Sequence, residues 1–235
     1  KINQPFYYDN PDALLSKTTR SLYQLLLDAA LNEQITEVYD DENLTIKLSP
    51  EGIKKRLEAV IIDDAAIDIL NTGRQLTEQE KKEYTDHIKT TTDKVKVLKI
   101  MGMWFIDKRD GQMKYRPLAI SAMGPDPSIQ GKLGPDNKPM AAGDELIDLF
   151  WIYYPSAREI LANNYVFNKK NSSADLSFDD IINARRFSSI IYKSSAGLGD
   201  GVIKDYIPRD ADEQLEESDK IKAQILQMEN DMWNY

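Results

Sequence analysis

The chain has 235 residues, of which 41% are hydrophobic and 29% charged, a composition typical of a folded globular protein. Its formal net charge of −9 disfavours nucleic-acid binding, because a phosphate backbone is recognised by a concentrated basic face. The absence of cysteine excludes disulfides, thiolate catalysis and cysteine-ligated zinc, and the single histidine, His87, limits histidine chemistry.

No stretch has the twenty or so apolar residues that a membrane helix needs, so we expect a chain without a membrane span. The first residue is Lys1 and not methionine, which indicates a processed chain.

The first ninety residues predict mostly helices. Asn10 followed by Pro11 is typical of a helix start, and a helical stripe then continues to about Leu31. Residues 35–39 and 44–48 predict a short hairpin across an acidic turn, after which Ser49 and Pro50 open another helix. This second helix is expected to carry the apolar residues Ile53, Leu57, Val60 and Ile61, but its end stays open, because residues 60–70 fit the period of a helix and that of a strand.

Residues 77–89 are strongly polar and predict a solvated helix. Thr77 and Glu80 have the spacing of a capping box, and His87 is expected at the helix surface.

Residues 95–123 predict a long β-hairpin with a two-residue type I′ turn at Asp110 and Gly111. This turn would bring Asp107 near Lys114 and Phe105 near Arg116. Pro117 inside the second strand indicates that one side of the hairpin is an edge.

The strongest strand signal is at residues 146–154, which are apolar on both faces except for Asp148. The preceding residues, 124–143, are rich in Pro and Gly and predict an irregular loop. Pro155 begins a short helix that closes near Asn163, and Ser177 caps another that runs to about Arg186. Residues 187–193 are then expected to be extended.

The C-terminal residues 210–235 predict an acidic helix after a flexible connector at 194–201. Ile221, Ile225, Met228 and Met232 recur at offsets of four, three and four, and Trp233 flanks them. We take these five residues as a candidate partner interface. The stripe has two open interpretations, since it can fold onto its own domain or dock on a neighbour.

Other motifs have ordinary structural explanations. Residues 197–201 resemble a phosphate loop but lack the Lys-Ser/Thr that should follow. The acidic clusters at 40–42, 63–64 and 179–180 lack calcium-loop spacing and fit turns or helix caps, and the serines lack a nucleophile elbow. Arg185 and Arg186 either pin an anionic group or end a helix. We therefore assign no catalytic, cofactor or metal residues.

Several blocks of sequence, in this order, resemble the GldN/PorN family of Bacteroidetes gliding motility and type IX protein secretion. They follow a helix and the segment 34–41, and they are Trp104-Phe105-Ile106-Asp107-Lys108-Arg109, Arg116-Pro117-Leu118-Ala119-Ile120, Leu149-Phe150-Trp151-Ile152-Tyr153-Tyr154-Pro155-Ser156-Ala157-Arg158, Val166-Phe167-Asn168, Ser177-Phe178-Asp179-Asp180, Arg186-Phe187-Ser188-Ser189-Ile190-Ile191-Tyr192-Lys193 and Ile203-Lys204-Asp205-Tyr206. The chain departs from the family pattern at 111–113 and 193–196.

The resemblance implies a non-catalytic periplasmic protein, attached to the outer membrane through its partners. It implies assembly with an outer-membrane lipoprotein of the GldK/PorK type into a ring, and contact with the periplasmic part of the GldL/GldM motor. It implies no catalytic residues and no cofactor.

We predict an α+β fold with a mainly antiparallel sheet, flanking helices and a C-terminal helical arm. Residues 1–208 are expected to form one domain, mostly helical over 1–90 and sheet-containing over 91–208, and residues 209–235 the acidic arm. The alternative function is a periplasmic glycan- or small-molecule-binding protein or a carboxylate-based hydrolase. A deep pocket with converging carboxylates would favour that alternative.

Overall fold

A computed structural model of the chain describes residues 6, 20–62, 73, 77, 85–127, 146–166, 176–195 and 201–232. The chain groups into two compact units. The first, which we name the sheet unit, comprises Gln4–Met101 and Pro117–Asp180. The second, the hairpin-arm unit, comprises Lys1–Asn3, Gly102–Arg116 and Ile181–Tyr235. The predicted division of the chain at residue 208 stays a prediction.

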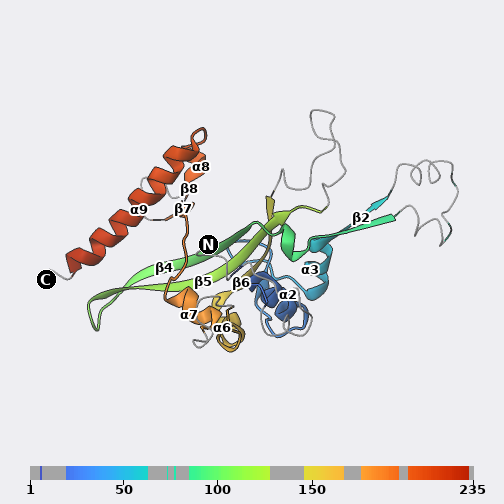
Figure 1. The fold of residues 1–235 in the computed structure, drawn as a ribbon, viewed down its shortest axis with the longest axis horizontal. Helices are drawn as coiled ribbons and strands as arrows, with labels where there is room; N and C mark the ends of the chain where they lie inside the picture. The colour runs from blue at the N-terminus through green and yellow to red at the C-terminus, as the bar shows by residue number, and fades with distance from the viewer. Residues whose placement is uncertain are drawn as a thin grey trace. The chain divides into compact units, whose positions relative to one another are not determined.

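The largest sheet has four strands in the order β1-β6-β5-β4. Its strands β4 and β5 form the long hairpin drawn in green in Figure 1. These strands are β1 (Val38–Tyr39), β4 (Val97–Asp107), β5 (Gln112–Pro125) and β6 (Leu146–Tyr153). The β1–β6 and β5–β6 pairs are antiparallel. Two further antiparallel pairs join β2 (Glu58–Ile62) to β3 (Thr85–Lys89) and β7 (Lys193–Ser194) to β8 (Gly201–Val202). The predicted α+β class with an antiparallel sheet is confirmed.

Strand β6 forms the centre of the core. Its residues Leu149, Phe150, Trp151 and Ile152 are all between 0 and 1% exposed, so both faces of the strand are covered, as predicted. The helices α3 (Pro50–Leu57) and α6 (Tyr154–Asn163) contact this strand. Tyr23 of α2 (Leu22–Leu31) stacks on Phe150 with ring centroids 5.8 Å apart.

The N-terminal helix is shorter than predicted. Ser21 is extended, with φ −64° and ψ 154°, and its hydroxyl accepts a hydrogen bond from the Gln24 backbone N–H. A single helix from Pro11 to Leu31 is therefore wrong, because a cap at Ser21 starts α2 at Leu22. Residues 7–19 lie outside the described residues, and the helical stripe continues on α2 with Leu22, Leu25, Leu26 and Ala29, which are all buried.

The predicted hairpin at 35–48 is confirmed, since the Asp40 N–H donates to the Ile46 carbonyl at 2.9 Å. Ser49 caps α3 as predicted.

The following segment contains more strand than the helical assignments predicted. Val60 and Ile61, for which a strand was the open alternative to the second helix, lie on β2, because α3 ends at Leu57. The assignment of residues 85–89 to a polar helix is wrong. Thr85–Lys89, predicted as the end of a polar helix, is strand β3, with His87 opposite Val60. Hydrogen bonds between strands pair the backbone N–H and C=O groups of a polar segment just as a helix would. The periodicity of the sequence does not show which strand is the partner.

The long hairpin is present, but its turn differs from the prediction. Strand β4 ends at Asp107 and β5 begins at Gln112, so four residues form the loop. Gly111 has a φ of 67°, whereas Asp110 has no positive φ, and a type I′ turn needs positive φ at both. The Gly111 N–H donates to the Asp107 carbonyl at 2.8 Å, which closes this wider turn.

The predicted edge is confirmed. Strand β4 is the last strand of the sheet, and the pairing of β5 with β6 begins only at Ala119, after Pro117. Gly124 and Pro125, predicted as loop, belong to β5, where they pair with β6 because the strand continues past a bulge at Ala122/Met123. Residues 128–143 lie outside the described residues.

The C-terminal helices agree with the sequence. Helix α6 closes at Asn163, and α7 (Phe178–Asn183) follows Ser177. The Ser177 hydroxyl accepts from the Asp180 N–H at 3.1 Å, while the Asp180 carboxylate accepts from the Ser177 N–H at 3.2 Å, so the two form a capping box. Between α7 and β7 the chain forms no helix. The short α8 (Ile203–Tyr206) precedes the predicted C-terminal helix, α9 (Ala211–Met232).

Replacing Phe150 with alanine removes a ring that is 1% exposed and stacked on Tyr23. We expect the free energy of unfolding to fall by about 3–5 kcal/mol, because the substitution leaves a cavity in the core. Urea denaturation measures this loss. Tyr153→Ala on the same strand, where the side chain is 37% exposed, should cost much less, and equal losses would contradict the central position of Phe150.

Candidate functional site

The acidic pair at the first hairpin has structural partners. Asp40 forms an ion pair with Arg56 of α3. Asp41 accepts hydrogen bonds from the backbone N–H groups of Ile46 and Thr45, each at 2.9 Å, and these bonds lower the pKa of its carboxyl. Both carboxylates thus stabilise a turn, and the cluster at 63–64 lies outside the described residues.

The acidic pair at α7 also serves the fold. Asp179 is 8% exposed and accepts from the Tyr154 hydroxyl at 2.5 Å and from the Arg158 Nε at 3.3 Å. Asp180 completes the capping box described above. These contacts join α6 to α7 within the sheet unit, so the two carboxylates do not converge on an open space.

The remaining sequence candidates do not assemble into a reactive site. Among the described residues, no group of three or more His, Asp or Glu side chains has the arrangement of a metal site. His87 lies on β3, and Gly201 of the glycine-rich segment lies on β8. In the same parts of the chain, no helix is long and apolar enough to cross a membrane.

The end of the long hairpin concentrates charged and aromatic groups. Lys114 Nζ lies 2.9 Å from Asp107 Oδ2 and 2.5 Å from Asp110 Oδ2. Arg116 lies over the ring of Phe105, with its guanidinium carbon 5.2 Å from the centroid. The predicted Asp107–Lys114 and Phe105–Arg116 contacts are therefore confirmed.

The lysine between two carboxylates changes the titration of all three groups. Hydrogen bonds from Lys114 lower the pKa of Asp107 and that of Asp110, and the same bonds raise the pKa of Lys114. A salt-bridged cluster of this kind holds the turn in place and leaves neither carboxylate available as a general acid near neutral pH.

Arg185 follows the end of α7, and its side chain contacts the aromatic rings of the hairpin. Its N–H donates to the Ile182 carbonyl at 3.1 Å, and the Arg186 N–H donates to the Ile181 carbonyl at 2.9 Å, which is the bonding of a Schellman motif. Arg185 adopts φ 51°, a left-handed conformation that glycine usually takes at this position. The structure supports the helix-ending role of the arginine pair.

The aromatic pair of the hairpin stabilises this unusual residue. The Arg185 guanidinium carbon lies 4.3 Å from the Trp104 ring centroid and 5.7 Å from that of Tyr115. The two rings are 5.3 Å apart, and burial raises the pKa of the Tyr115 hydroxyl. A cation–π contact of this kind contributes about 0.5–1 kcal/mol at a partly exposed site.

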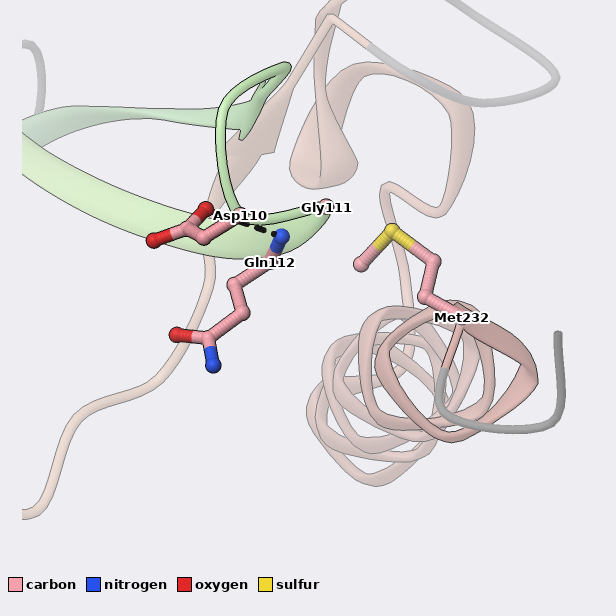
Figure 2. Close-up of a pocket in the computed structure, with 4 residues that line it drawn as sticks. All are labelled: Asp110, Gly111, Gln112 and Met232. Atoms are coloured by element: carbon pink, nitrogen blue, oxygen red, sulfur yellow. Dashed lines mark hydrogen bonds between the residues drawn. The ribbon is translucent and has the colours of Figure 1, made fainter.

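A small hollow lies at the turn of this hairpin. Figure 2 shows Met232 of α9 extending toward Gly111, with Asp110 and Gln112 as the other lining residues. Asp110 is the single carboxylate here, and it is paired with Lys114. The hollow therefore lacks the pair of converging carboxylates that a carboxylate-based hydrolase would need.

The two units differ in how many of their large apolar side chains are exposed. Among the described residues, the hairpin-arm unit buries four apolar side chains, Ile181, Ile182, Ile203 and Ile221. The same unit exposes seven large apolar side chains: Met103, Ile106, Ile190, Tyr206, Leu215, Leu226 and Met228. The described part of the sheet unit exposes four and buries most of the core. Among its described residues, the hairpin-arm unit therefore exposes more large apolar side chains than it buries.

The predicted interface residues of α9 fall into two groups. Ile221 is 7% exposed, and beside it the buried Ser218 hydroxyl accepts from the Ile191 N–H at 2.9 Å. Ile225 and Met232 are half-buried, Met228 is 57% exposed, and Trp233 lies outside the described residues. Ser218 and Ile221 thus pack on their own chain, whereas the second half of α9 keeps an uncovered stripe.

One residue and one contact of the hairpin-arm unit were not predicted. Leu226 is 58% exposed beside the predicted stripe, and its signal in the sequence is its position four residues after Lys222 and three before Glu229, on one side of the helix. The contact of Arg185 with Trp104 joins residues 81 positions apart, and the sequence contains no local signal for it.

Lys114→Met removes the cation that holds two carboxylates ionised. We expect the pKa values of Asp107 and Asp110 to rise toward those of ordinary aspartates, as followed by carboxyl ¹³C NMR titration. The sign for stability follows from the lowered folded-state pKa. The cluster stabilises the hairpin above the pKa of an unfolded aspartate, and this stabilisation is lost as the pH falls through the folded-state values. Lys108→Met, on the same turn, is the control, and equal shifts in the two variants would contradict the role of Lys114.

Comparison with known proteins places the whole chain in one family. No curated protein matches the sequence. A family model described as gliding motility associated protein GldN matches residues 1–234, which is essentially the entire chain. The earlier resemblance is thereby confirmed, and the chain belongs to the GldN family of gliding-motility-associated proteins.

Proposed function

We propose that this protein is a non-catalytic structural component of the gliding and type IX secretion machinery, and that it assembles with an outer-membrane lipoprotein into a periplasmic ring. Membership of the GldN family supports a role in gliding motility. The described carboxylates Asp40, Asp41, Asp179 and Asp180 are each engaged in a turn, a cap or an ion pair. In this proposal the chain acts through contact with other proteins.

The observation that carries this proposal is the uncovered second half of α9. After Ile221, no described residue of the helix is buried, although Ile225, Leu226, Met228 and Met232 are large and apolar. Exposed apolar surface of this extent is stabilised when a partner covers it. We therefore assign the stripe formed by Ile225, Met228 and Met232, with Trp233 next to it, to a contact with a neighbouring subunit of the assembly.

The partners follow from the family resemblance. They are a lipoprotein of the GldK/PorK type, which would hold the protein at the outer membrane, and the periplasmic part of the GldL/GldM motor. Nucleic acid is disfavoured by the net charge of −9. In this proposal the protein has no cofactor and works in the periplasm through contacts alone.

Replacing Ile225 and Met228 with serine should reduce assembly without unfolding the chain, because both side chains are incompletely buried. The tagged wild-type protein, expressed at its native level, should copurify from membranes in a high-mass complex that contains the lipoprotein. The variant should shift toward lower mass while its thermal unfolding stays cooperative.

The matched control replaces Gln224 and Gln227 with serine, since these residues lie on exposed positions of the same helical turns. An unchanged complex in the Ile225/Met228 variant would exclude this stripe as an interface. If the wild-type protein copurified without the lipoprotein, the proposed ring would be excluded. If the protein turned over a substrate and replacement of one acidic residue abolished that turnover, the alternative enzymatic function would be established.

A further inference from the structure

The second half of α9 carries a stripe that is complementary to itself. Lys222, Ile225, Leu226 and Glu229 have the spacing i, i+3, i+4 and i+7, so they share one side of the helix. When two such stripes lie antiparallel, the basic residue of one lies beside the acidic residue of the other, and the apolar residues lie beside each other. We name these four residues the KILE stripe; it borders the predicted stripe and shares Ile225 with it.

The KILE stripe is accessible in the single chain. Leu226 is 58% exposed, and Lys222, Ile225 and Glu229 are half-buried. Lys222 Nζ lies 2.9 Å from Asp219 Oδ1, but these side chains are 40% and 65% exposed. An ion pair this exposed contributes little and exchanges readily for another partner.

We propose that the KILE stripe pairs with the same stripe of a second copy of this chain, in antiparallel orientation about a two-fold axis between Ile225 and Leu226. This inference rests on the proposed function and names the neighbour that α9 contacts. The axis places Lys222 beside Glu229 of the other copy and Ile225 beside Leu226 of the other copy, and symmetry repeats each contact. Both contacts are favourable, since one joins opposite charges and the other joins apolar groups.

Parallel pairing is disfavoured by burial just before the KILE stripe and by charge. Ser218 is 0% exposed and its hydroxyl accepts from the Ile191 N–H, and Ile221 is 7% exposed, so this side of the helix is covered by its own chain within one turn before Lys222. Parallel helices in register would place Lys222 beside Lys222 of the other copy and Glu229 beside Glu229. Antiparallel helices overlap along their free halves only, and they replace these like-charge contacts with opposite ones.

Charge complementarity argues for a second copy over another acidic protein. Helix α9 carries seven carboxylates and two lysines. The acidic surface of a different protein would therefore repel it at most registers. The self-pairing register is favourable because it brings Lys222 to the partner's Glu229. An overlap this short buries less than the roughly 1,200 Å² of a stable dimer, so the contact is expected to form at the high local concentration of an assembly.

Charge reversal tests the register directly. Lys222→Glu and Glu229→Lys each place like charges opposite one another twice, and each should weaken self-association by roughly tenfold or more. The double variant K222E/E229K restores opposite charges and should restore association. Sedimentation equilibrium of the full chain over a range of high protein concentrations measures the dimerisation constant, and circular dichroism verifies folding of every variant.

Asp231→Lys is the matched control, because it makes the same change of charge as Glu229→Lys at an exposed position on the opposite side of α9. It should leave dimerisation within about twofold of the wild type. A monomeric wild-type chain, or a double variant that associates no better than the single variants, would overturn the proposal.

A zero-length carbodiimide cross-link tests the same contact in the intact assembly. With an equal mixture of ¹⁵N-labelled and unlabelled chains, about half of the peptides that join Lys222 to Glu229 should have one labelled and one unlabelled member, because the bond joins two copies paired at random. A cross-link in which both residues come from the same chain, or no cross-link in a complex that contains the lipoprotein, would overturn self-pairing while the proposed function stands. Loss of the lipoprotein from the wild-type complex would instead count against the proposed function.

Discussion

The fold depends on one strand that must be covered on both faces. Four consecutive residues of β6, Leu149 to Ile152, are almost completely buried, so neither period-2 face of the strand can meet water. Strands β1 and β5 occupy its two edges, and α3 and α6 contact it. Removal of these four large apolar side chains from water makes a large contribution to stability.

The hairpin-arm unit follows a different principle. Its described residues bury few apolar side chains, and individual polar and cation–π contacts fix its local structure. Lys114 forms ion pairs with two aspartates at the hairpin turn. Arg185 adopts a left-handed backbone conformation, and its guanidinium lies over the ring of Trp104. A unit built from such contacts keeps apolar groups at its surface, and α9 is its clearest example.

The chemistry of the chain is consistent with an assembly role. Its acidic clusters lack calcium-loop spacing and were expected in turns or helix caps, and the described pairs Asp40–Asp41 and Asp179–Asp180 are engaged in the local structure. The capping box of Ser177 and Asp180 and the turn at Asp41 show how such carboxylates stabilise backbone N–H groups. The family identification and the exposed stripe of α9 then point toward protein contact.

The sequence by itself determined the elements whose signals are local. The double-faced apolar run of β6, the caps at Ser49 and Ser177, and the acidic helix α9 were all predictable, because each depends on neighbouring residues. The family was also recognisable from ordered blocks of sequence. The tertiary structure alone decided the β2–β3 pairing, the four-residue turn at 108–111 and the division of α9 into covered and uncovered halves. Each of these depends on contacts between residues distant in the chain or on backbone angles, and periodicity and composition carry no information on either.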